Sequence, residues 1–379
     1  MSSLVVAHLS DLHVSRYGEH VTSLRTTLWS KQGKQAEDWE VVEEVDGWLV
    51  QRRAKWRWRL RDAEDALELR LLDEQGYVQQ KRKGRRSDEA QFRRELAQVA
   101  AERHLTEHGR LARALPTVAR VEELLADDPS NTNLLFLRAA YAIREAKPDW
   151  IAVTGDLTDD GIGYDLIEAA LAPFIDRERM LAIPGNHDVY GSPPFVVPSH
   201  ERKDVERKRS LWAPFARRIG LPGEGPWVRE LGEGAVICAV DSCTPAWTPL
   251  SASGEVPKPE LDRLNAAIDG LDLPLRIAML HHHVVNPPIL HVGRAPWQLG
   301  MRLRNAKEVY DYFREKRFTA VLNGHRHLGY RYHPAWAPLF LSAPSATLGC
   351  RTGAKPYFWR LEIRGGELLS VRERPLAPT

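Results

Sequence analysis

The residues of this chain best suited to chemistry are histidines, aspartates and an asparagine that follow short apolar runs. His325 and His327 lie two positions apart in a Gly-His-x-His loop, and an extended backbone turns both imidazoles to one side. Gly324 lets the chain turn closely beneath whatever they bind. Alone the pair is a weak signal, because His-x-His pairs also occur in ordinary surface loops.

Five apolar runs rich in β-forming residues each end at side chains of these types. The polar residues are Asp11 and His13 after residues 5–9, Asp156 after 150–154, Asn186, His187 and Asp188 after 181–183, the histidines of 281–283 after 277–280, and His325 and His327 after 318–322. Continuous apolar runs are typical of buried strands in an α/β sheet. Because ligands of such folds collect beyond the strand ends, the pattern predicts one site assembled from five loops.

The residue types in these loops favour a metal site. Carboxylates, an amide oxygen and neutral imidazoles suit Zn, Fe or Mn, and the absence of cysteine from the loops argues against a thiolate site. Buried carboxylates and imidazoles that bound no cation would leave costly unpaired polar groups.

In order, the motifs Asp-x-His, Gly-Asp, Gly-Asn-His-Asp, a histidine run and Gly-His-x-His resemble those of the calcineurin-like metallophosphoesterase superfamily. The last three look most like its bacterial cyclic-nucleotide-phosphodiesterase-like branch. The resemblance implies an α/β (α+β) fold, the four-layer αββα sandwich, with an inserted α+β subdomain after the first strand. It also implies a binuclear metal-dependent phosphoester hydrolase, for which we favour a phosphodiester substrate such as a cyclic nucleotide.

The resemblance also assigns roles to single residues. It implies one cation bound by Asp11, His13, Asp156 and His327, and a second bound by Asp156, Asn186, His281 and His325. In the histidine run His282 is the alternative to His281. Two cations of this kind share a hydroxide that attacks phosphorus, and His187 is the position that protonates or stabilises the leaving oxygen. The hypothesis that Asp188 orients His187 rests on adjacency alone.

The spacing of the motifs predicts two parts of the chain. Residues 1–17 and 131–379 are expected to form the metallophosphoesterase core, and 18–130 an inserted subdomain. Alternation over 39–83 predicts an antiparallel meander, and 87–127 has helical spacing with a break near Pro116. Core helices are expected at 134–146, 161–174, 201–219 and 259–268, and further strands at 236–241, 276–280, 339–341, 357–363 and 368–372.

Three alternative functions stay open. A nuclease would use the same metals and could bind nucleic acid through the basic stretch 81–86, but nearby acidic residues favour a solvated strand face. A phosphomonoesterase would need the same motifs. A scaffold without activity is expected to have lost ligands, and every required residue type is present.

Composition places further bounds. The net charge of +2 indicates neither a nucleic-acid nor a membrane partner, and no apolar run approaches the roughly 20 residues that span a bilayer. The three cysteines show no metal spacing and are expected to be buried free thiols. Because Asp11 lies so near the start, a cleaved signal peptide would remove part of the site, so a cytoplasmic location is expected.

Overall fold

The computed structural model describes residues 3–15, 18, 40–45, 48–54, 66–72, 78–103, 107–159, 161–190, 202–244, 252–286 and 301–376. The chain divides into two compact units. The first consists of Met1–Val21, Glu107–Pro193 and Pro198–Thr379, and the second consists of Thr22–Thr106 with Pro194–Val197. Each unit is described here by itself.

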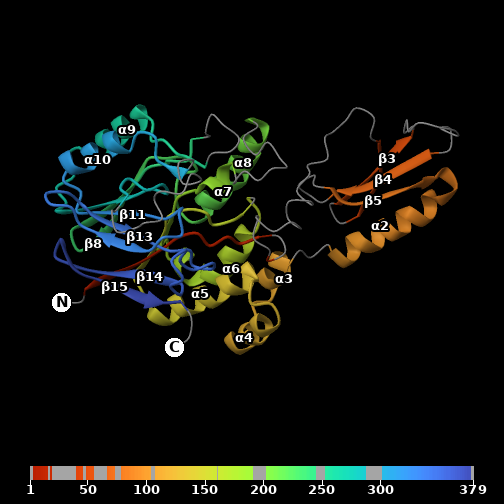
Figure 1. Cartoon of the computed structure of the whole chain (residues 1–379), viewed down its shortest axis with the longest axis horizontal. Coiled ribbons are helices and arrows are strands. Elements are labelled where there is room, and N and C mark those ends of the chain that lie inside the picture. Colours follow the sequence, from red (N-terminus) through yellow and green to blue (C-terminus); the bar gives the residue numbers. More distant parts are fainter. Residues whose placement is uncertain are drawn as a thin grey trace. The chain divides into compact units, whose positions relative to one another are not determined.

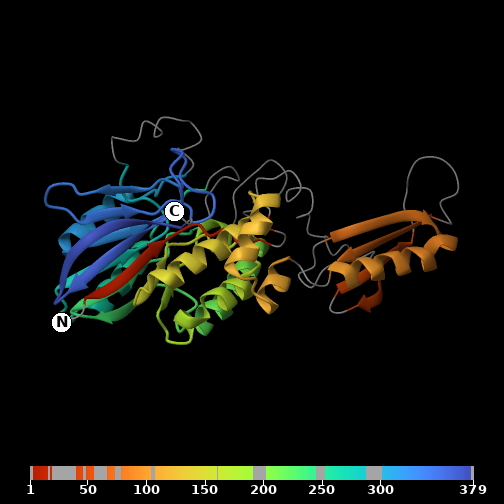
Figure 2. The ribbon, with the colours of Figure 1, turned by 90° about the horizontal axis from the view of Figure 1, so that it is seen from below.

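One sheet of the first unit joins the two ends of the chain. Its order is β15-β14-β1-β6-β7, with β1 at Leu4–Leu9, β6 at Trp150–Val153, β7 at Met180–Ala182, β14 at Tyr357–Arg364 and β15 at Glu367–Pro375. Strand β1 runs parallel to β6 and antiparallel to β14, and β6 runs parallel to β7. Figure 2 shows red β1 beside the blue C-terminal strands. The parallel strands β1, β6 and β7 therefore end at the same edge of this sheet.

The second sheet of this unit has the order β12-β13-β11-β10-β9-β8. Its strands are β8 (Trp227–Gly232), β9 (Ala235–Ala239), β10 (Leu275–Met279), β11 (Ala320–Asn323), β12 (Tyr330–Tyr332) and β13 (Leu339–Ser342). Strands β9, β10, β11 and β13 are parallel, and β8 and β12 lie antiparallel at the two edges.

The two sheets share one core, which makes the first unit a four-layer sandwich. Val6 and Leu361 of the first sheet belong to the same buried cluster as Ile277 and Leu322 of the second. Helices α5 (Thr132–Ala146) and α6 (Tyr164–Ile175) pack against the first sheet, and α9 (Lys258–Ile268) and α10 (Ala306–Glu315) against the outer face of the second (Figure 1). The αββα fold predicted from the sequence is confirmed.

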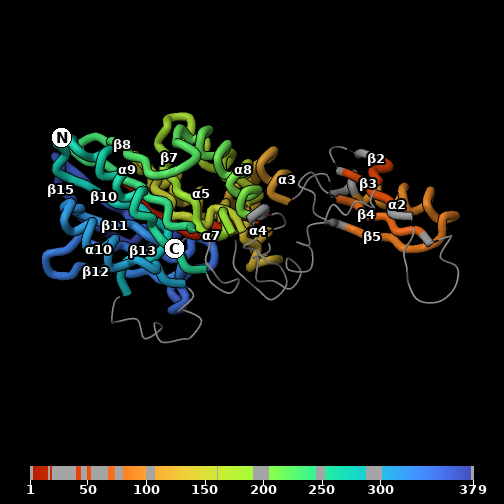
Figure 3. Tube along the Cα trace, turned by 90° about the horizontal axis from the view of Figure 1, so that it is seen from above, coloured from red at the N-terminus to blue at the C-terminus, as the bar shows by residue number. Residues whose placement is uncertain are grey.

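The second unit has its own small core. Strands β2 (Glu40–Val45), β3 (Trp48–Ala54), β4 (Ala66–Leu72) and β5 (Val78–Arg85) form an antiparallel sheet in that order. Helix α2 (Glu89–Arg103) lies along this sheet (Figure 3). A short 3₁₀ turn, η1 (Arg86–Asp88), links α2 to β5. Alternate residues of β4, all leucines, pack with Leu96 of α2, separately from the main core. The alternating pattern of the sequence thus corresponds to a meander.

The boundary between the units differs from the expected one. The second unit ends at Thr106, whereas sequence analysis extended the insertion to residue 130. Helices α3 (Glu107–Arg113) and α4 (Val118–Asp127) belong to the first unit, because Val121 and Leu125 of α4 are buried in the main core. Their polar composition gave no sign of this, since only a narrow apolar stripe of each helix is covered.

Two further helices and two expectations about the chain remain to be compared with the structure. Helix α8 (Arg202–Arg218) matches the predicted basic helix, and α7 (Asn186–Val189) is a single turn that the sequence did not predict. All three cysteines are free and buried, as expected. Within the described ranges, no helix is long and apolar enough to cross a membrane.

Candidate metal centre

The five predicted loops meet, and backbone hydrogen bonds join two pairs of them. The Asp11 N–H donates to the Gly155 carbonyl and the His13 N–H to the Asp156 carbonyl, each at 3.0 Å. The Gly324 N–H donates to the His281 carbonyl at 3.1 Å. These bonds connect the loop after β1 to the loop after β6, and the loop after β11 to the loop after β10. Main-chain bonds between strand ends therefore set the positions of the candidate ligands.

Five candidate ligands have an uncommon backbone conformation. Positive φ angles of 50° to 75° occur at Asp11, His13, Asp156, His325 and His327. A non-glycine residue in this left-handed region costs roughly 1–2 kcal/mol. Residues held in such conformations cluster at functional sites, where the surrounding structure enforces them. The loops thus hold these side chains in place against a local preference for other conformations.

Two glycines permit the close approach of the loops. A Cβ on Gly185 would overlap the backbone nitrogen and carboxylate of Asp156, and a Cβ on Gly324 would overlap the Ser10 hydroxyl. Any larger residue at these positions would push apart the chains that carry the ligands.

One group of donor atoms, named here the His281 cluster, consists of Asp156, Asn186, His281 and His325. His281 Nε2 lies 3.0 Å from Asn186 Oδ1, 3.4 Å from Asp156 Oδ2 and 3.1 Å from His325 Nδ1. The opposite nitrogen, His281 Nδ1, lies 2.7 Å from the Thr154 carbonyl, which can only accept. His281 therefore carries its proton on Nδ1, and in the neutral ring Nε2 turns a lone pair toward the amide and carboxylate oxygens.

A second group, the His13 cluster, consists of Asp11, His13 and His327. His13 Nδ1 lies 2.6 Å from Asp159 Oδ1, so it donates there and leaves Nε2 with a lone pair when the ring is neutral. That Nε2 is 2.9 Å from His327 Nε2, which is 3.3 Å from Asp11 Oδ1. Again, electron-pair donors face one another.

The donor chemistry and spacing of both clusters fit metal ions. Ligands held about 2.1 Å from one cation lie roughly 3 Å from each other, which is close to the separations in both clusters. Asn186 strengthens the fit, because its Oδ1 faces two imidazole nitrogens while its buried Nδ2 has no partner among the described residues. A positive charge at the centre of each cluster would turn mutual repulsion into attraction.

The titration of these groups reflects the same crowding. Burial by itself lowers the pKa of His13, but nearby carboxylates, Asp159 above all, raise it to about 9. Burial by itself also lowers the pKa of His281, but nearby carboxylates, Asp156 above all, raise it to about 9. Burial also raises the pKa of Asp156, yet the neighbouring His281 and His187 hold it well below its usual range. A cation must displace protons from His13 and His281, so acid is expected to weaken metal binding.

His187 lies beside the His13 cluster and faces a residue that sequence analysis missed. Its Nδ1 is 3.2 Å from Asp159 Oδ1, and its ring meets the His13 ring edge-on with centroids 4.9 Å apart. One buried carboxylate, Asp159, is therefore hydrogen-bonded to His13 and lies beside His187. The signal was present in the sequence as an aspartate three residues after Asp156 in the same loop.

The hypothesis that Asp188 orients His187 is not supported by the geometry. The carboxylate of Asp188 accepts hydrogen bonds from the backbone N–H groups of Gly185, Leu157 and Thr158 at 2.9 to 3.0 Å. It also accepts from the hydroxyls of Thr158 and Tyr164. Successive side chains of a helical turn point about 100° apart, so neighbours in α7 face different directions. Asp188 instead ties the loop after β6 to the loop after β7.

The structure brings His281, and not His282, to the other donor atoms. His282 Nδ1 lies 2.9 Å from Ser242 Oγ and Nε2 lies 3.0 Å from the Ala252 carbonyl, so both nitrogens bind the scaffold. His8 lies behind the cluster, with Nε2 3.0 Å from the Thr154 hydroxyl. Burial lowers the pKa of His8 and of His282 to about 3, which keeps both rings neutral.

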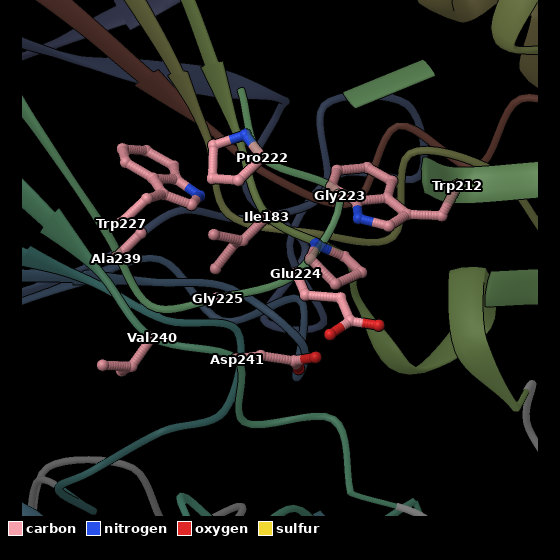
Figure 4. A pocket seen from close by; sticks show the side chains of 11 residues that line it. Ile183, Trp212, Pro222, Gly223, Glu224, Gly225, Trp227, Ala239, Val240 and Asp241 are labelled. Atoms are coloured by element: carbon pink, nitrogen blue, oxygen red, sulfur yellow. The ribbon is translucent and has the colours of Figure 1, made fainter. Parts of the chain in front are cut away.

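A hollow near the Gly185–Asn186 turn is separate from the two clusters. Trp212 and Trp227 lie on opposite sides of it, with Glu224 and Asp241 along its lower side (Figure 4). Its lining includes Ile183 and Pro184, which lead into the turn, but none of the candidate ligands. The hollow therefore lies next to the turn and is not the candidate metal site.

Comparisons with known proteins show the family to which the chain is similar. A model of the calcineurin-like phosphoesterase family matches residues 108–329, more than half of the chain. No curated protein matches. Asp11 and His13 lie before the matched region, and the fold brings them next to His327.

Solved structures similar to the chain have low identity to it. A dimetal phosphatase from Danio rerio is 11% identical, with 65% of this chain and 88% of that chain covered and a TM-score of 0.42. A purple acid phosphatase from yellow lupin is 10% identical, with 63% and 49% covered and a TM-score of 0.43, so the match spans about half of that enzyme. A phosphopantetheinyl hydrolase from Mycobacterium tuberculosis is 14% identical, with 52% and 79% covered and a TM-score of 0.35.

Replacing each of two neighbouring histidines should separate a ligand from a scaffold residue. We expect His281→Asn to retain about one Mn per chain where the wild type retains two, because the His281 cluster loses its central nitrogen. His282→Asn should retain two ions and lose only thermal stability. Metal content after dialysis, measured by plasma mass spectrometry, checks this. Equal metal loss in both variants would contradict the assignment.

The role of Asp159 can be tested against a matched aspartate–histidine pair. Asp159→Asn should weaken Mn affinity about 10- to 100-fold, because the partner that orients His13 loses its charge. Asp165→Asn removes the half-exposed carboxylate that contacts His108 at 2.8 Å, and should leave Mn affinity unchanged. Titration of the metal-free proteins with Mn gives both values, and circular dichroism verifies folding. An unaltered affinity in Asp159→Asn would show that the contact does not orient His13.

Proposed function

The chain belongs to the calcineurin-like phosphoesterase family, and from this premise we propose that it hydrolyses phosphoesters with two bound metal ions and prefers phosphodiesters. The observation that carries the proposal is the convergence of electron-pair donors in the His13 and His281 clusters. Asp156 is proposed to serve both ions, since its carboxylate contacts His281 and its charge acts on both Asp11 and His13. The donor set suits Mn, Fe or Zn.

The two ions would supply Lewis-acid activation of water and of the phosphoryl oxygens. The chain itself supplies orientation. Asp156 Oδ1 accepts a hydrogen bond from the His187 N–H at 2.8 Å, which attaches the His187 backbone directly to a candidate ligand. The buried Lys208 ammonium donates to the His187 carbonyl at 2.8 Å. His187 is thus held from both sides of its backbone.

His187 is proposed to deliver a proton to the leaving oxygen. Because Nδ1 lies 3.2 Å from the Asp159 carboxylate, we assign the transferred proton to the opposite nitrogen, Nε2. The side chain is 7% exposed, so it is largely shielded from competing water.

A phosphodiester, including a cyclic nucleotide, is preferred as substrate because the Gly-Asn-His-Asp and Gly-His-Arg-His motifs resemble the phosphodiesterase-like branch. Nucleic acid is not favoured. In the basic stretch of β5, Arg82 pairs with Glu95 at 2.8 Å and Lys83 lies 4.0 Å from Glu68, so part of its charge is balanced. The cytoplasmic location stays a prediction, with the three free thiols in agreement.

The proposal is tested with two nitrophenyl substrates, a phosphodiester and a phosphomonoester, in the presence of Mn. We expect faster cleavage of the diester and loss of activity on metal removal. His187→Ala should lose about 10²- to 10⁴-fold on an ester with a poor alkoxide leaving group, and less on the nitrophenyl esters, whose leaving group needs little protonation. The exposed His333→Ala serves as the control.

Each alternative has its own outcome, in this experiment or in a parallel assay with DNA as the substrate. A preference for the monoester would replace the phosphodiesterase by a phosphatase, and strong inhibition of DNA cleavage by added salt would favour a nuclease. No turnover with Mn, Fe or Zn, despite two bound ions, would return the chain to a scaffold role.

A further inference from the structure

We propose that Asn133 is a positioning residue for the candidate metal centre, which keeps His13 in a metal-binding conformation by fixing the chain that follows it. Asn133 lies in the first turn of α5, outside the five loops that carry the candidate ligands. The inference rests on the metal ions of the proposed function and does not depend on hydrolysis.

His13 has a backbone conformation that the surrounding chain must enforce. Its φ angle is 50°, and that of Asp11 is 54°, so two residues of one short segment are left-handed. The Val14 N–H donates to the Leu157 carbonyl, and the Val14 carbonyl accepts from the Asp159 N–H, each at 3.0 Å. The strain of two left-handed residues is comparable with the net contribution of two such hydrogen bonds. Further bonds beyond Val14 are therefore needed to keep the segment in place.

Asn133 supplies these bonds, because its side chain binds both backbone groups of Ser15, two residues after His13. Its Oδ1 accepts from the Ser15 N–H at 2.9 Å, and its Nδ2 donates to the Ser15 carbonyl at 2.9 Å. Asn133 is 0% exposed and Ser15 is 3% exposed, so water cannot replace either bond. One side chain thus sets the position of the chain just beyond a candidate ligand.

The same turn of α5 binds the two segments that lead to and from the second unit. The Thr132 N–H donates to the carbonyl of Gly18, shortly before that unit begins, at 2.7 Å. Asn133 Nδ2 lies 3.5 Å from Oε1 of Glu107, the first residue after that unit. A displacement of the leading segment would reach His13 through Ser15, and Asn133 is the residue that opposes it.

The bonds of Asn133 are not those of a helix cap. Capping of α5 belongs to Asn131, whose side chain accepts from the Leu134 N–H at 3.0 Å. Asn133 follows inside the helix, where asparagine forms helix less readily than alanine does. Its side-chain bonds to Ser15 join α5 to the segment after His13 and do not stabilise the helix itself. This separates a role in positioning His13 from a role in forming α5.

The test titrates the metal-free proteins with Mn, followed by calorimetry and by electron paramagnetic resonance, which distinguishes an isolated Mn ion from a coupled pair. Asn133→Ala should weaken one of the two binding steps about tenfold to a hundredfold, as loss of a residue that orients a ligand does. The other step should not change. Asn133→Asp keeps the acceptor for the Ser15 N–H, so it should fold even if Asn133→Ala does not, and its affinity should lie between.

Asn305→Ala is the matched control. Asn305 makes the same pair of bonds with Val256, accepting from its N–H at 3.1 Å and donating to its carbonyl at 2.7 Å, and Val256 is not next to a candidate ligand in the sequence. This variant should lose thermal stability and keep both Mn affinities. In a His13→Asn background, Asn133→Ala should cause no further loss of Mn affinity, because it acts through His13.

The outcomes separate this inference from the proposed function. Equal weakening of both steps in the Asn133 variants, no weakening of either, or the same loss in Asn305→Ala would overturn it even if nitrophenyl esters are hydrolysed. A further loss in the His13→Asn background would also count against it. Selective weakening supports it even if no ester is cleaved, in which case the proposed hydrolysis alone has failed. A wild type that binds no Mn would refute the metal centre and this inference with it.

Discussion

Buried donor atoms that face one another across about 3 Å, and that need a proton or a metal cation between them, are the constraint on which the rest of this structure depends. Buried oxygens and imidazole nitrogens that meet without a positive charge repel, and they have also lost their hydration. In the His281 cluster, His281 Nε2 lies 3.0 Å from Asn186 Oδ1, and in the His13 cluster two imidazole nitrogens are 2.9 Å apart. Such an arrangement persists only if the surrounding fold enforces it. The strands, glycines and backbone bonds around the site supply that enforcement.

The sandwich holds the facing donor atoms in place through parallel strands and a few buried polar side chains. Two sheets that share one core bring the loops after β1, β6 and β7 to those after β10 and β11. Asp188 then joins the loops after β6 and β7 with its carboxylate. Burial and the charge of Asp156 raise the pKa of Asp188, and its hydrogen bonds oppose that effect. Asp188 thus joins two loops of the candidate site, while Asp159 contacts the side chains of His13 and His187.

The fold and the candidate ligands were predictable because their signals are local. Apolar runs that stop at Asp11, Asp156 or His325 mark strand ends, and strand ends of parallel sheets coincide in space. It was not predictable in the same way that Asp159, and not Asp188, lies beside His187. It depends on the direction in which one turn of helix points each side chain, and adjacency to His187 carries no such information. The end of the second unit at Thr106 was also not predictable, because the sequence does not show that α4 packs against the main core.

Different parts of the candidate site determine the type of reaction and the choice of substrate. The candidate metal ligands are confined by backbone strain and close packing, so few other residues could replace them at these positions. The loop of residues 343–356, between β13 and β14, is attached to the candidate site by the backbone N–H groups of Ala346 and Arg351 and by the Ser345 hydroxyl. Its exposed side chains can therefore change while its shape stays. Loops of this kind are where selectivity is placed on a shared scaffold. A positively charged centre attracts any phosphoester, and the residues around its rim decide which one fits.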